Sequence, residues 1–87
     1  MKIKEGFSLV NRSGQRIVEA NNGSSGLNNA IVLNETSAFL WNLLKEKDVT
    51  KTEMLNALLE NFEVSTVLAL ADIDVFVRTM NENGIIE

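Results

Sequence analysis

The sequence contains no cysteine and no histidine. Their absence excludes disulfide bonds, thiolate or imidazole metal sites, and catalysis by Cys-His or Ser-His-Asp groups. A small domain without disulfide bonds is typical of a reducing compartment, so a cytoplasmic location is expected. We expect neither export nor membrane insertion, because no apolar run is long enough for a signal peptide or for a span of about 18 residues.

Proline is absent too, so no linker signal divides the 87 residues. The chain is shorter than the roughly 100 to 200 residues of a usual domain, which predicts a single domain over residues 1–87. Domains of this size have thin cores with little room for an enclosed active site. Together with the missing nucleophiles and bases, this predicts a protein that is not an enzyme and holds no metal or cofactor.

Basic residues are scarce in the last third of the chain. Residues 1–62 carry seven Lys/Arg and seven Asp/Glu, whereas residues 63–87 carry only Arg78 against five acidic residues. The whole net charge of −4 therefore lies in residues 63–87. A polyanion would be repelled by this segment and a basic peptide attracted to it.

The first part of the chain predicts three strands separated by turn residues. Strands Phe7–Val10 and Gln15–Ala20 flank Asn11-Arg12-Ser13-Gly14, where glycine supplies the positive φ of a three- to four-residue hairpin loop. Residues 21–26 are rich in turn formers and predict a loop. The apolar run Ala30-Ile31-Val32-Leu33 then predicts the third strand.

Two helices with capping residues are predicted next. Asn34 can cap a helix that begins at Glu35 and ends near the charged connector 45–48. Thr50 and Glu53 have the spacing of a capping box at the start of the second helix. The apolar residues expected to face the core from these two helices are Ala38, Leu40, Trp41, Leu44, Leu55, Leu58, Leu59 and Phe62.

A third helix is predicted from about Val67 to Asn83, with Ser65 or Thr66 as its cap and Gly84 in the left-handed conformation that ends it. The short turn before it favours a helix-turn-helix. The whole order predicts an α+β fold with a three-stranded antiparallel sheet followed by three helices. The inward face of the third helix is expected to carry Leu70, Ile73, Phe76, Val77 and Met80.

A second apolar stripe lies on the opposite side of this helix. It consists of Leu68, Ala71 and Val75, flanked by Asp72 and Thr79. A second apolar surface on a short helix can mark a docking groove, but scattered surface aliphatics are also common in monomeric proteins. The residues alone leave both interpretations open.

Four segments in the last two thirds of the chain resemble one known family. They are Leu33 to Leu44, which contains Leu-Asn-Glu-Thr and ends beyond a tryptophan, then Glu60 to Val64, Ala71 to Val77, and Gly84-Ile85-Ile86-Glu87. Each segment by itself contains only helix-capping or core residues, which many proteins have. Their order and spacing from Leu27 to Ile86 are far more specific to one family. In this order they resemble the PqqD family, named for coenzyme PQQ synthesis protein D.

The resemblance implies a winged-helix-like, non-catalytic adaptor. Such a protein binds the leader of a ribosomally made precursor peptide and presents it to a modifying enzyme, often a radical-SAM protein. The leader would add as a strand beside the third strand, in a groove lined by the third helix. Asp72 would pair with a basic or polar leader residue. The residues expected to bind the peptide are the backbone of Asn29, Ala30, Ile31 and Val32, and the side chains of Leu68, Asp72, Val75 and Thr79.

Two alternatives compete with peptide binding. A DNA-binding winged helix would use the third helix, but this helix offers only Arg78 against Asp72, Asp74 and Glu82, which opposes phosphate binding. We therefore expect no nucleic-acid partner. The other alternative is a dimerisation or protein-interaction module, in which the outer stripe meets a second copy or an enzyme domain.

Overall fold

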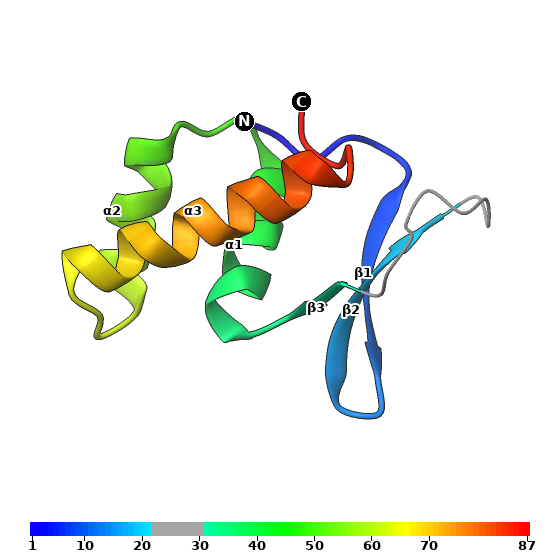
Figure 1. Cartoon of the computed structure of the whole chain (residues 1–87), viewed down its shortest axis with the longest axis horizontal. Coiled ribbons are helices and arrows are strands. Elements are labelled where there is room, and N and C mark those ends of the chain that lie inside the picture. The colour runs from blue at the N-terminus through cyan, green and yellow to red at the C-terminus, as the bar shows by residue number, and fades with distance from the viewer. Residues whose placement is uncertain (22–30) are drawn as a thin grey trace.

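The computed structural model describes residues 1–21 and 31–87 and has an α+β fold, as predicted (Figure 1). A three-stranded antiparallel sheet with strand order β1-β2-β3 precedes three helices. The elements are β1 (Phe7–Arg12), β2 (Gln15–Ala20), β3 (Ile31–Leu33), α1 (Glu35–Glu46), α2 (Lys51–Asn61) and α3 (Thr66–Glu82). No helix within the described residues is long and apolar enough to cross a bilayer.

The β1–β2 hairpin has a tighter turn than the sequence predicted. Its loop consists of two residues, Ser13 and Gly14, with φ of 54° and 80°, so β1 continues to Arg12 and does not end at Val10. Two consecutive positive φ values are typical of the turn whose twist matches the flanking strands. Arg12 pairs with Gln15 in the ladder and donates through Nε to a Glu19 carboxylate oxygen at 2.7 Å. The predicted three- to four-residue loop was therefore wrong.

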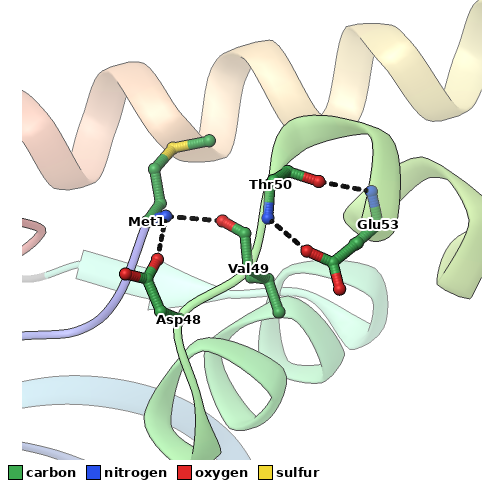
Figure 2. Close-up of polar contacts among 5 residues, drawn as sticks. All are labelled: Met1, Asp48, Val49, Thr50 and Glu53. Atoms are coloured by element: carbon green, nitrogen blue, oxygen red, sulfur yellow. Dashed lines mark hydrogen bonds and ion pairs between the residues drawn. The ribbon is translucent and has the colours of Figure 1, made fainter.

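The three predicted helix caps are confirmed. Asn34 Oδ1 accepts a hydrogen bond of 2.9 Å from the Ser37 N–H, and Ser65 Oγ accepts one of 3.2 Å from the Leu68 N–H. Both hydrogen bonds of the predicted capping box are present (Figure 2): the Glu53 N–H donates to Thr50 Oγ1 at 3.1 Å, and the Thr50 N–H donates to Glu53 Oε1 at 3.0 Å. Each cap satisfies amides that the helix itself leaves unpaired.

The capping box predicts a pH-dependent contribution to stability. The Thr50 N–H that donates to the Glu53 carboxylate holds the pKa of Glu53 below its ordinary value of 4.5. A lowered folded-state pKa means that the stabilisation is present above the unfolded pKa and is lost as pH falls through the folded pKa. Wild type should therefore be more stable than Glu53→Gln at pH 6, and this difference should shrink towards pH 3 in urea unfolding followed by Trp41 fluorescence.

Glu60→Gln, an exposed change in the same helix, is the matched control. The difference in unfolding free energy between Glu60→Gln and wild type should not shrink between pH 6 and pH 3. A Glu53→Gln difference that is constant over this range would contradict a contribution from the carboxylate charge.

The core lies where the three helices and the inner face of the sheet meet. Trp41, Leu44 and Phe76 are buried as predicted, and Phe39 packs edge-on against Phe62 with ring centroids 5.3 Å apart. The prediction for α2 was partly wrong. Leu59 is 38 % exposed, whereas the unpredicted Met54 is fully buried. Met54 and Leu58 lie one turn apart and face the core together, and Leu59 is rotated about 100° further round the helix.

An N-terminal segment that the sequence pattern left unassigned completes this core. Ile3 is 3 % exposed and forms a β-bridge with Ile86, while its N–H donates to the Leu44 carbonyl at 3.1 Å. The Met1 ammonium group donates to the Asp48 carboxylate at 2.6 Å and to the Val49 carbonyl (Figure 2). The first residues therefore tie the α1–α2 connector to the end of the chain.

Candidate functional site

A groove of about 320 Å³ lies between β3 and α3. Its lining carries no charged side chain. Phe76 and Met80, which are almost fully buried, form its apolar floor, and Val32 and Val75, which are 51 % and 59 % exposed, stand at its sides. The complete lining is Val32, Leu33, Asn34, Ser37, Val75, Phe76, Thr79 and Met80.

Local structure explains why these side chains meet. Side chains alternate across β3, so Ile31 and Leu33 point into the core while Val32 points outward. On α3, Val75 and Thr79 are one turn apart on the side that faces this strand. The polar groups of Asn34, Ser37 and Thr79 add hydrogen-bonding capacity to the otherwise apolar surface.

One edge of β3 borders this groove without a strand partner in the described part of the chain. β3 pairs with β2 through Arg16↔Leu33, Ile17↔Val32 and Val18↔Ile31, and residues 1–21 and 31–87 supply no strand on its other side. In an antiparallel arrangement, alternate residues direct their N–H and C=O groups towards each edge. The open edge can therefore accept a further extended chain, whose side chains would enter the groove.

The structure brings together only some of the predicted peptide-binding residues. Val32, Val75 and Thr79 line the same groove, whereas Leu68 and Asp72 lie nearer the start of α3 and do not line it. Asn29 and Ala30 lie outside the described residues, and the side chain of Ile31 is buried. The role of every one of these residues in peptide binding stays a prediction.

Sequence reasoning missed five of the lining residues: Leu33, Asn34, Ser37, Phe76 and Met80. Phe76 and Met80 were assigned only to the core, because a buried helix stripe does not reveal which of its members also borders a surface hollow. Asn34 and Ser37 were known as a cap and its first turn, and the turn from β3 into α1 is what brings them to the groove. Leu33 was assigned only to the third strand. Only a correct packing angle between β3 and α3 would have identified these five.

The charges near the groove are carried mainly by α3. Asp74 forms an ion pair with Lys51 of α2, which ties the start of α2 to the middle of α3. Asp72 is half-buried and has no ion-pair partner among residues 1–21 and 31–87. Within the same residues, no group of three or more Asp or Glu side chains has the arrangement of a metal site.

A shallower hollow of about 230 Å³ lies between α1 and α2. It borders the capping box, and Glu53 in its lining already accepts the Thr50 N–H. No free strand edge accompanies this hollow in the described part of the chain, and its lining includes the charged residues Lys47, Glu53 and Glu60. The β3–α3 groove is therefore the stronger candidate for a binding site.

Comparisons with known proteins identify the fold and the family of the chain. The fold is similar to a solved structure described as TbiB1 in complex with the TbiA(beta) leader peptide, with a TM-score of 0.72 and 17 % sequence identity over 100 % of this chain and 95 % of that one. A comparison with curated proteins gives no match. The family model for coenzyme PQQ synthesis protein D (PqqD) matches residues 9–86, nearly the whole sequence. The chain therefore belongs to the PqqD family.

Proposed function

We propose that this protein is a non-catalytic adaptor that binds the leader of a ribosomally made precursor peptide and presents it to a modifying enzyme. The observation that carries the proposal is the apolar groove between β3 and α3 beside the open edge of β3. Membership of the PqqD family and the similar fold of a protein solved with a leader peptide support it.

The leader binds by strand addition. Its backbone pairs with the outward N–H and C=O groups of β3, so affinity does not depend on one particular sequence. Alternate leader side chains enter the groove, where they cover Val32 and Val75 and contact Phe76. Because these side chains are apolar and the rim is uncharged, the groove selects uncharged leader residues.

The chemistry belongs to a partner. This chain has no cysteine or histidine to act as nucleophile or base, so the modifying enzyme, for which a radical-SAM protein is our first candidate, performs the reaction. We place the encounter in the cytoplasm, where ribosomal peptides are made, and assign binding to a single domain of residues 1–87. A homodimer is a further arrangement in which the same domain can act.

An amide-shift titration tests the proposal. The full chain is titrated with the leader of a candidate precursor encoded nearby, and a scrambled peptide of the same composition serves as control. We expect the largest shifts at residues 31–33 and at Val75 and Thr79, and smaller shifts from the scrambled peptide, which can pair its backbone but does not match the groove. Shifts centred on β1, the opposite edge of the sheet, would contradict binding beside β3.

A further inference from the structure

The exposed apolar surface extends beyond the groove. Five large hydrophobic side chains are exposed among the described residues, and four of them lie on β3 and α3: Val32, Val67, Leu68 and Val75. Leu68 is 60 % exposed and does not line the groove. A second apolar position therefore exists on the helix that forms one wall of the site.

Helix geometry places this position in line with the groove. Leu68, Asp72, Val75 and Thr79 follow one another at spacings of four, three and four residues, so they share one face of α3. Leu68 lies two turns before Val75, which is about 10.5 Å along the helix axis. An extended chain covers that distance in three to four residues, and because its side chains alternate, it is the residue four positions on that faces the same side.

Charge favours a basic occupant for the space between these apolar positions. Asp72 lies between Leu68 and Val75 on the shared face. Residues 52–77, between Lys51 and Arg78, include five acidic residues and no basic one, and the charge of Asp74 is paired with Lys51. The field along this part of α3 is therefore negative, and it attracts a basic side chain.

We propose that the bound leader continues past the groove along α3 and contacts Leu68 and Asp72. The leaders this protein binds then form a defined class: two apolar side chains four residues apart, with a basic residue midway between them. This inference rests on the proposed function, and it names the chemistry of the peptide that the site selects. The continuous face from Thr79 to Leu68 favours one peptide over a separate partner at Leu68.

Peptide selection tests this class without knowledge of the natural precursor. The immobilised full chain is used to select binders from a display library of random twelve-residue peptides. We expect enrichment of two apolar residues at a spacing of four with Lys or Arg midway between them, and depletion of Asp and Glu. The most enriched peptide is then synthesised and its affinity is measured by titration calorimetry.

Two variants test the contacts, each with a matched control. Leu68→Ser should weaken binding about fivefold, because it removes partly exposed apolar surface that the peptide covers. Asp72→Asn should weaken binding about twofold at low salt and less at high salt. Val67→Ser, which alters an exposed apolar residue about 100° round the helix, and Glu60→Gln on α2 should leave affinity unchanged.

The failures of the two proposals are distinguishable. If the selected peptides depend on Val75 for affinity but bind Leu68→Ser and Asp72→Asn as tightly as wild type, the extension along α3 is wrong and binding in the groove stands. Enrichment of acidic peptides would also overturn it. A library that yields no binder dependent on Val75 would overturn the proposed function itself. If Leu68→Ser changed only self-association in sedimentation, this position would belong to a contact between two copies, and the extension would be wrong.

Discussion

Replacing Val75 with glutamate should weaken leader binding by about thirtyfold or more. The side chain is 59 % exposed and lines the groove, so the change places a carboxylate where an apolar leader side chain has to sit. Burying a polar group without a partner costs at least about 2 kcal/mol, which corresponds to this loss in affinity. Titration calorimetry with a leader that binds wild type measures the effect.

Val67→Glu is the control for this prediction. It makes the same substitution at a residue of α3 that is 76 % exposed and does not line the groove. We expect leader affinity close to that of wild type, and both variants should unfold at wild-type urea concentrations because neither side chain is buried. Equal losses from the two substitutions would mean that general acidity, and not the groove, weakens binding.

The second large effect concerns stability. Trp41 is 1 % exposed and is the largest side chain of the core, so Trp41→Ala leaves a cavity among α1 and its neighbours. Such truncations cost about 3 to 5 kcal/mol, a large part of the roughly 5 to 15 kcal/mol that stabilises a typical domain. Urea unfolding followed by far-UV circular dichroism measures the loss, since the variant lacks the only tryptophan.

Two further variants test whether the loss of stability in Trp41→Ala comes from the cavity. Asn42→Ala changes the exposed neighbour of Trp41 and should alter the unfolding free energy by less than about 0.5 kcal/mol. Trp41→Phe, which keeps most of the apolar volume, should fall between wild type and Trp41→Ala. If Trp41→Ala unfolded at the wild-type midpoint, the packing around this residue described above would be wrong.

Helix starts could be predicted because their signals are local. Asn34, Thr50 and Ser65 each bond an amide three residues ahead, so a side-chain type at a fixed spacing is sufficient to identify the cap. The end of α3 is equally local, because Gly84 adopts the predicted left-handed conformation with φ of 67°. These features depend on a few neighbouring residues and not on the rest of the fold.

Features that depend on distant residues could not be predicted in this way. Ile3 is buried only because Ile86 and Leu44 meet it, and neither partner is marked by the sequence around Ile3. In α2 the choice between Met54 and Leu59 for the core depends on how the helix is rotated against α3. Both residues are apolar, so periodicity alone did not resolve that rotation.

In the candidate site, too, the features set by neighbouring residues could be predicted and those set by distant residues could not. The face that carries Val75 and Thr79 follows from helical spacing, and the outward position of Val32 follows from strand alternation. Where the groove stops along α3 depends on the crossing of β3 and α3, which spacing does not encode. For that reason Leu68 and Asp72 were grouped with the groove, although its lining ends near Val75.

The bridge between Ile3 and Ile86 bears on how the protein reaches its native state during translation. Contacts between positions far apart in the sequence form only after a large loop has been closed, which makes them slow to form. Ile85 and Ile86 are core residues that leave the ribosome after all three helices have been synthesised. Until then Ile3 lacks its bridge partner, and the nascent chain exposes an incomplete core that chaperones can recognise.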